Sequence, residues 1–265
     1  MRKALQFSAI TLSLSLAASA AWADNHRWNK GPFSFIKQHF QDFKELTGIV
    51  EELADAQPDV VDIDEYNFFN NNYDRRLVDQ NGHNAPGECD NRLVQARWTD
   101  DVLTHNISHS NSVTGAPCGY DLAISYKPIS EGEGLAVNVM QVPQIPGFEQ
   151  TYSPTVQFFP QKVRIGESWG GVYSVEDRFQ GNPLNTVTVL RTSTLLSKLD
   201  SVTVPAGTFE DCVTVSVREE SAGSEGMPTL RALEANTLCR DIGVVRRVLV
   251  VSGYDYQLES YLPGE

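Results

Sequence analysis

The sequence predicts a mainly β protein, built as a curved antiparallel sheet or half-barrel with an N-terminal amphipathic helix. Three observations indicate this class. Apolar and polar residues alternate in short stretches, turn residues separate these stretches at hairpin spacing, and no helix-length pattern lies between them. We divide the chain into a signal peptide (1–23), a helical extension (24–66) and a disulfide-stapled antiparallel β domain (67–265).

The N-terminus has the form of a secretory signal peptide. Arg2 and Lys3 supply positive charge, residues 4–20 are apolar or small, and Ala-Trp-Ala at 21–23 is a cleavage signal before Asp24. The apolar run is too short for a stable membrane span, although an uncleaved anchor is the alternative. Because no cysteine stands at the cleavage point, we expect a periplasmic or secreted protein rather than a lipoprotein.

The composition fits a folded exported domain with an acidic surface. Hydrophobic residues make up 41% of the chain, enough for a core. Cleavage lowers the number of Lys and Arg from 21 to 19 against 34 Asp and Glu, so the net charge becomes −15. Such a surface repels nucleic acid and anionic lipid headgroups, and its simplest role is solubility.

Four cysteines remain after cleavage: Cys89, Cys118, Cys212 and Cys239. An even number in an oxidising compartment predicts two disulfides, for which three connectivities exist. We expect pairing between sequence neighbours, Cys89 with Cys118 and Cys212 with Cys239, because each pair brackets one alternating stretch. Each closure would stabilise the fold by roughly 3–4 kcal/mol. No Cys-x-x-Cys motif is present, so zinc or thioredoxin-type chemistry is not expected.

An amphipathic helix is predicted between residues 33 and 56, ended by Pro58. Its apolar stripe consists of Ile36, Phe40, Phe43, Val50 and Leu53. We expect this stripe to pack on the β domain; a membrane-surface helix would carry more Lys and Arg on its polar face. Residues 67–87 are rich in Asn, Asp and Gly and are predicted to form a loop.

The remaining chain is predicted to form an antiparallel meander. The candidate strands are residues 93–105, 120–126, 134–142, 163–175, 186–191, 195–204, 212–218, 244–251 and 254–261. The clearest is 163–175, whose apolar residues fall on one side of the strand while Ser168 falls on the other.

Residues 166–170, Gly-Glu-Ser-Trp-Gly, fit the G-x-S-x-G pattern of a serine hydrolase. An α/β-hydrolase places its catalytic histidine after the serine, yet all five histidines precede Ser168. The alternation also continues through Ser168, whereas a nucleophile elbow requires a sharp strand-to-helix turn. In the chymotrypsin-like order His, then Asp, then Ser, the histidine would be His105 or His109. The glycine-rich residues that such an enzyme carries around its serine are absent here. We therefore expect no catalytic role for Ser168, and a secreted serine hydrolase is the alternative.

Three segments of the C-terminal half resemble TapB-like and related domains of unknown function in bacterial envelope proteins. They are residues 163–169 (Val-Arg-Ile-Gly-Glu-Ser-Trp), 202–212 (around Val-Pro-Ala-Gly-Thr-Phe) and 241–247 (around Gly-Val-Val). The resemblance covers residues 150–263 and implies a curved antiparallel sheet without catalytic residues. In it, Gly207 and Gly243 would permit chain bends, and Trp169 and Phe209 would fill the core. The chain departs from the pattern at 238–240, where an aromatic residue is common.

Two further clusters could suggest metal binding. His105 and His109 would stand about 13 Å apart on a strand, too far to share a zinc ion, so we expect surface histidines. Acidic residues gather near 59–65 and 79–90 without the pattern of a calcium loop. We read them as solvated loops, and we expect neither a metal nor a cofactor.

The sequence thus predicts a non-catalytic secreted or periplasmic protein that binds an apolar or glycan ligand or an envelope partner. A purely structural role in envelope assembly is a further alternative. The aromatic residues that could line the concave face of the sheet are Phe158, Phe159, Trp169, Tyr173 and Phe179. The same residues would be simple core if that face is filled.

Overall fold

The computed structural model describes residues 60–66, 72–85, 88–128, 135–154, 160, 162–222 and 228–264. The expected signal peptide and the expected helix at 33–56 lie outside these residues, and so do Phe158 and Phe159. Within the described ranges, no helix is long and apolar enough to cross a membrane.

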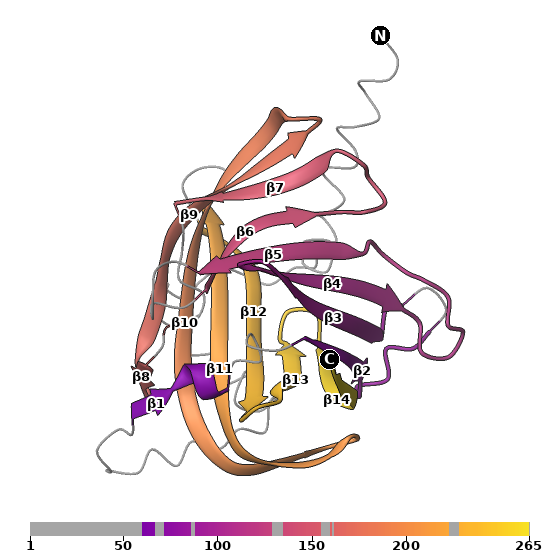
Figure 1. Cartoon of the computed structure of the whole chain (residues 1–265), viewed down its shortest axis with the longest axis vertical. Coiled ribbons are helices and arrows are strands. Elements are labelled where there is room, and N and C mark those ends of the chain that lie inside the picture. The colour runs from indigo at the N-terminus through magenta and orange to yellow at the C-terminus, as the bar shows by residue number, and fades with distance from the viewer. Residues whose placement is uncertain are drawn as a thin grey trace, which may run out of the picture.

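Twelve antiparallel strands form a closed barrel (Figure 1). They are β2 (Tyr73–Asp79), β3 (Asn91–Thr99), β4 (Val102–Ser110), β5 (Leu122–Pro128), β6 (Leu135–Gln141), β7 (Phe148–Ser153), β9 (Ser168–Phe179), β10 (Asn182–Val204), β11 (Gly207–Ala222), β12 (Pro228–Cys239), β13 (Gly243–Leu249) and β14 (Tyr254–Pro263). Neighbours around the barrel follow chain order, and β14 pairs with β2 to close it. The predicted antiparallel β architecture is confirmed, but the sheet closes completely instead of stopping at a half-barrel.

Alternation along the strands separates an inner from an outer face. In β2 every second residue is buried, from Tyr73 through Arg75 and Leu77 to Asp79. The inward positions of β2 are therefore occupied by arginine and aspartate as well as by apolar residues. This mixture distinguishes the interior from an ordinary hydrophobic core.

A small unit outside the barrel strands fills part of the interior. Strand β1 (Val60–Asp62) pairs with β8 (Lys162–Arg164), and the 3-10 turn η2 (Ile63–Glu65) follows β1. Its buried residues Ile63, Tyr66 and Val163 join a cluster with barrel residues such as Leu195 and Leu103. The main core therefore lies between this unit and the barrel wall.

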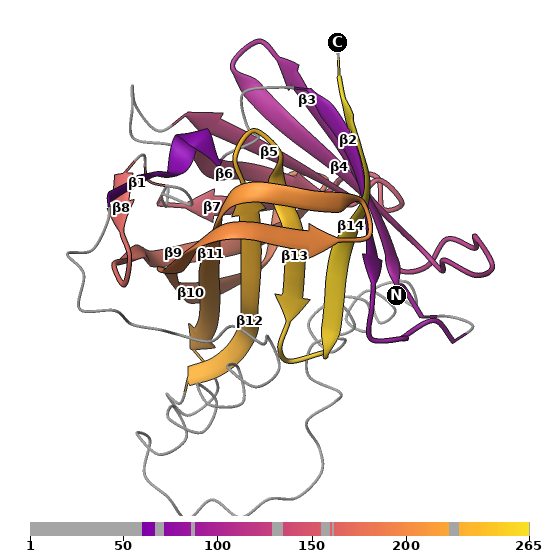
Figure 2. The same ribbon diagram turned by 90° about the horizontal axis from the view of Figure 1, so that it is seen from below.

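The long β10–β11 hairpin bends at its end and lies across β12, β13 and β14 (Figure 2). Its turn is the Val-Pro-Ala-Gly segment, where Gly207 has φ +135° and the amide of Ala206 donates to the carbonyl of Leu258. Val204, Leu258 and Cys212 belong to a second buried cluster, with Phe209 packed against it. Only glycine adopts such a φ without strain, which explains the turn sequence.

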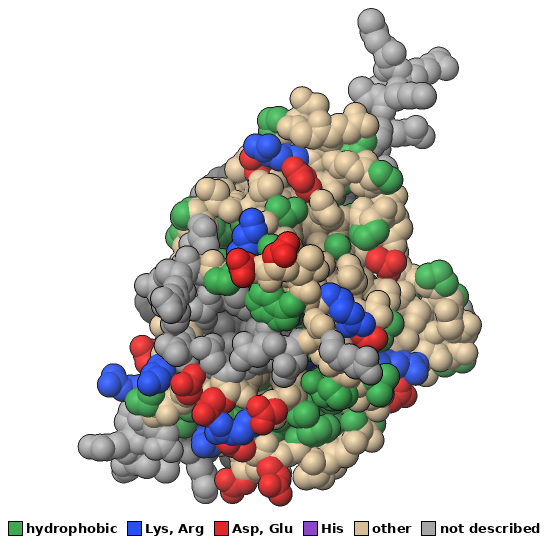
Figure 3. Space-filling view, in the orientation of Figure 1, with side chains coloured by type: hydrophobic (Ala, Val, Ile, Leu, Met, Phe, Trp, Pro, Cys, Tyr) green, Lys and Arg blue, Asp and Glu red, His purple; other side chains and the backbone are tan. Residues whose placement is uncertain are grey.

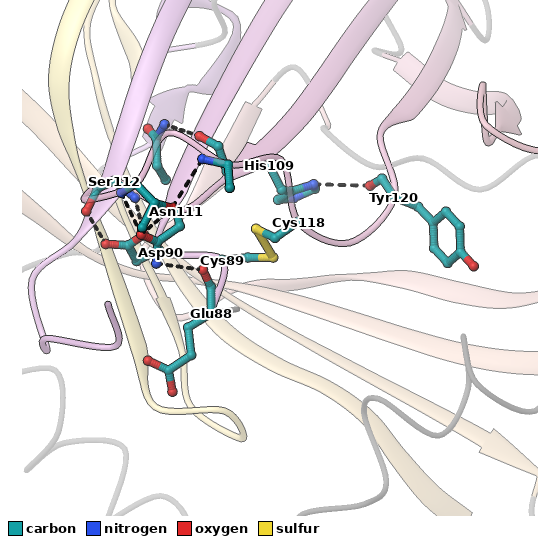
Figure 4. The surroundings of a disulfide bond; sticks show 12 residues. Glu88, Cys89, Asp90, His109, Asn111, Ser112, Cys118 and Tyr120 are labelled. Atoms are coloured by element: carbon teal, nitrogen blue, oxygen red, sulfur yellow. Dashed lines mark hydrogen bonds between the residues drawn. A yellow bond between two sulfur atoms is a disulfide. The ribbon is translucent and has the colours of Figure 1, made fainter. Parts of the chain in front are cut away.

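Both predicted disulfides are confirmed: Cys89 pairs with Cys118, and Cys212 pairs with Cys239. The second bond joins register partners on β11 and β12, and both of its cysteines are fully buried. The first ties the segment before β3 to the β4–β5 connection (Figure 4). Beside it the Asn111 amide donates to the carbonyls of Asn84, Ala85 and Glu88.

The strand boundaries differ from the sequence prediction in several places. Residues 93–105 are two strands, with Asp100 at φ 53° in the turn between them, and 163–175 is divided between β8 and β9. Residues 186–191 and 195–204 belong to one strand, β10, which carries a bulge between Leu195 and Ser197. Strand β2 lies in the expected loop at 67–87, and β7 and β12 were not predicted.

Candidate ligand-binding cavity

The inner face of the barrel lines a partly open cavity of about 820 Å³. This volume lies in the range of small-molecule sites, roughly 300–1,000 Å³. Among the described residues, its apolar lining comes from ten strands and consists of Leu77, Val94, Ile107, Leu122, Ile124, Val137, Val175, Val187, Val215, Val217, Leu230, Ala232, Leu238 and Val244. An apolar lining of this extent suits a ligand with a hydrocarbon or other apolar body.

The charged residues that line the cavity are mostly cationic. Among the described residues, they are Arg75, Arg92, Arg191, Arg231, Arg247, Glu219 and Glu234. Five arginines and two glutamates give the lining a formal charge of +3, whereas the whole chain carries −13. On the face seen in Figure 3, acidic and basic side chains are intermixed.

Two of the arginines form ion pairs inside the barrel. Arg191 Nη1 donates to Glu219 Oε1 at 2.7 Å, and the same carboxylate oxygen accepts from the Tyr173 hydroxyl at 3.1 Å. Arg247 Nε lies 2.5 Å from Glu234 Oε2. These pairs neutralise both glutamates of the lining, so neither carboxylate is left to balance the other arginines.

A third arginine belongs to a hydrogen-bonded network with Tyr73 and His105. Arg75 Nη2 donates to the Tyr73 hydroxyl at 3.2 Å, and its Nη1 donates to the Val244 carbonyl at 3.2 Å. The Tyr73 hydroxyl also lies 2.9 Å from His105 Nε2. Burial, followed by repulsion from Arg75 and Arg92, holds the pKa of His105 well below its usual value. His105 is therefore neutral at physiological pH.

A fourth arginine of the lining, Arg92, faces the cavity. Its register partners are Leu77 on β2 and His109 on β4. In the described part of the chain, no hydrogen bond or ion pair engages its guanidinium. Burial, then repulsion from Arg247, lowers the pKa of Arg92 to about 9. His109 Nδ1 donates to the Tyr120 carbonyl at 3.2 Å (Figure 4), and burial and Arg92 lower the His109 pKa.

Of the five predicted ligand-lining aromatics, Tyr173 alone is found in the cavity lining among the described residues. Trp169 packs beside the β1–β8 unit as part of the main core, and Phe179 lies at the end of β9 opposite Phe148. The functional residues that sequence reasoning missed are the inward arginines. The sequence signal that could have revealed them is an arginine at an inward position of an alternating strand. Arg75, which alternates with Tyr73 and Leu77, is an example.

The Gly-Glu-Ser-Trp-Gly segment is a turn that leads into β9, not a strand-to-helix elbow. Gly166 has φ +84° in the turn, and Ser168 is exposed, with its hydroxyl 2.8 Å from Thr194 Oγ1. At Gly170 a Cβ atom would lie 2.1 Å from the Arg191 carbonyl oxygen on β10. The two glycines therefore serve the turn and the close approach of strands.

Two expectations about polar clusters were wrong. His105 is buried inside the barrel and His109 faces the cavity, because strand β4 turns both of them inward. Asp79 and Asp90 are also buried rather than solvated: Asp79 accepts from the Asp255 amide at 2.6 Å, and Asp90 accepts from Ser112. Among the described residues, no group of His, Cys, Asp and Glu could hold a metal ion.

No family model and no curated protein matches the chain. Among solved structures, it is similar to a protein from Bacteroides fragilis NCTC 9343 described as exported and of YmcC-like fold. The identity is 11% and the TM-score 0.43, over 72% of this chain and 94% of that chain. It is also similar to a protein from Parabacteroides distasonis ATCC 8503 described as a lipoprotein, with 14% identity and a TM-score of 0.38, over 72% of this chain and 95% of that chain. The TapB-like resemblance of residues 150–263 stays an expectation.

Proposed function

We propose that this chain is a non-catalytic extracytoplasmic binding protein that holds one elongated apolar molecule inside its barrel. The observation that carries the proposal is the cavity of about 820 Å³ inside the barrel, with apolar lining residues contributed by most strands. A barrel of about eight strands has an interior that side chains just fill, and the diameter grows with the number of strands, so a twelve-stranded barrel has room for a ligand. The two disulfides fit an oxidising compartment.

The position of the apolar wall favours a molecule within the barrel over a partner on its surface. Val175 on β9 and Val187 on β10 are register partners that face the cavity, and Val217 on β11 lines it further along, opposite Ser193. On the same strands the outward residues include Thr186 and Thr188, and the exposed apolar pair of Val172 and Leu190 is smaller than the apolar lining inside. Apolar surface is therefore offered to a ligand mainly inside.

The test is binding of N-phenyl-1-naphthylamine, a neutral apolar fluorophore whose emission rises in a dry site. We expect saturable binding with one site per chain. Val187→Trp fills the cavity from a half-buried lining position and should weaken binding at least about tenfold, a loss of roughly 1.4 kcal/mol. Thr188→Trp adds the same side chain on the exposed face of β10 and serves as the matched control.

The control should bind like the unaltered protein. Binding that does not saturate, or that Val187→Trp leaves unchanged, would contradict an interior site. Equal loss in both variants would point to the outer surface of the β9–β10 hairpin and to a protein partner instead.

A further inference from the structure

The cavity has an excess of positive charge at one part of its wall. Arg75, Arg92 and Arg247 influence one another electrostatically, and Glu234, a carboxylate close to Arg92, is already paired with Arg247. The neighbouring imidazoles of His105 and His109 have lowered pKa values, and an imidazole supplies no negative charge. Within the described part of the chain, the charge of Arg92 is therefore not balanced by a carboxylate of its own.

Arg92 is the centre of this imbalance. A guanidinium has five N–H donors, and in a purely structural role on the inner face of a barrel it would be paired, as Arg191 is with Glu219. Arg92 has no such partner among the described residues, and its Nε is buried without a hydrogen bond. A buried guanidinium without a partner lowers the stability of the protein. An anionic ligand that made a bidentate contact with Arg92 would offset this loss.

Apolar side chains begin directly beside Arg92. Leu77 is its register partner on β2, Val94 is the next inward residue on β3, and Ile107 and Leu122 extend the surface across β4 and β5. A ligand with its anion at Arg92 could thus lay an apolar tail along the wall without a break. The juxtaposition matches a molecule that has one charged end and one apolar chain.

We propose that the ligand is an anionic amphiphile, a single carboxylate or phosphate on an apolar chain, whose head group is held by Arg92 with Arg75 and Arg247 nearby. The inference rests on the proposed interior site and adds the chemistry of the ligand. Arg92 supplies the bidentate contact, while Arg75 and Arg247, held by Tyr73 and Glu234, contribute charge at fixed positions. The acidic exterior gives no such attraction, so selection occurs inside.

The test is displacement of the bound naphthylamine by dodecanoate, dodecyl phosphate and dodecanol, which share one chain length. We expect the anions to compete at concentrations about ten- to hundredfold lower than dodecanol. Arg92→Gln should remove this preference and leave dodecanol unchanged, and Arg92→Lys should restore part of it. Arg76→Gln is the control and should retain the preference. Arg76 precedes Leu77, the register partner of Arg92, on β2, and its side chain pairs with Glu259 outside the barrel.

The outcomes separate the two proposals. If dodecanol competes as well as both anions, or if Arg92→Gln weakens all three alike, the anionic head is refuted while the interior site stands. If neither the naphthylamine nor any amphiphile binds, the interior site itself fails. A preference for dodecanoate alone identifies a carboxylate, and a preference for dodecyl phosphate alone identifies a phosphate; either result supports the role of Arg92.

Discussion

Asp211 is at the centre of a network of ion pairs and hydrogen bonds that connects the β1–β8 unit to the barrel. Its carboxylate accepts the Tyr66 hydroxyl at 2.7 Å and the Arg240 guanidinium at 2.6 Å, and Lys198 lies 3.3 Å away. Arg240 also pairs with Glu65 at the end of η2. Tyr66 comes from the segment after η2, so this network joins the unit to β11, β10 and the turn after β12.

The perturbation is Asp211→Asn. The Tyr66 hydrogen bond, followed by those from Arg240 and Lys198, lowers the pKa of Asp211 from 3.8 to about 2. This difference corresponds to roughly 2.5 kcal/mol. Because the side chain is 31% exposed, solvent screening leaves about 1 kcal/mol as the expected loss in free energy of unfolding. Asparagine keeps an oxygen for Tyr66 and tolerates the φ of 50° at this position, while its amide nitrogen replaces the oxygen that accepts from Arg240, so the substitution removes the charge and that hydrogen bond.

The assay is urea unfolding followed by tryptophan fluorescence, to which Trp169 beside the unit contributes. A carboxylate with a depressed pKa stabilises the fold above its unfolded pKa, and this contribution disappears as the pH falls through the folded pKa. The difference between the two proteins should therefore be about 1 kcal/mol at neutral pH and should shrink as the pH falls from about 4 to about 2. Asp200→Asn, at an exposed position of β10, is the control. A difference that stays constant down to about pH 2, or an equal loss in the control, would refute the reasoning.

Three further results are expected. Arg92→Met should raise the free energy of unfolding of the empty protein by about 1 kcal/mol, measured by urea unfolding, because it removes a cation without a carboxylate partner; a loss would contradict this. Gly170→Ala should destabilise by at least about 2 kcal/mol through its clash with β10, whereas Gly171→Ala, which meets nothing within 4 Å, should stay within about 0.5 kcal/mol. Mild reductant followed by alkylation and mass spectrometry should label Cys89 and Cys118 before Cys212 and Cys239, which are fully buried; the reverse order would contradict their burial.

The sequence predicted the antiparallel β architecture and both disulfide pairs, because alternation and the spacing of cysteines are local signals. It missed β2 and β12 for one physical reason. Their inward positions include Arg75, Asp79 and Glu234, so the apolar period that marks a half-buried strand is interrupted. Two of these polar residues, Arg75 and Glu234, line the cavity.

Closure of the barrel could not be read from the sequence. It depends on the pairing of β14 with β2, where Leu258 lies opposite Leu77, a contact between distant parts of the chain. The aromatic residues chosen as ligand contacts were selected by type alone. Trp169, Tyr173 and Phe179 share one face of β9, because each is an even number of residues from the next, and their positions along the strand separate them. Tyr173 lies at the cavity, whereas Trp169 packs against the main core and Phe179 lies at the end of the strand.

The most direct test of the interior site is a crystal structure of the protein with ω-bromododecanoate, in which anomalous scattering locates the bromine. The account predicts a bromine peak inside the barrel against the apolar lining, with the carboxylate in hydrogen-bond contact with Arg92. A bromine peak on the outer face of the barrel, with the cavity unchanged, would contradict it.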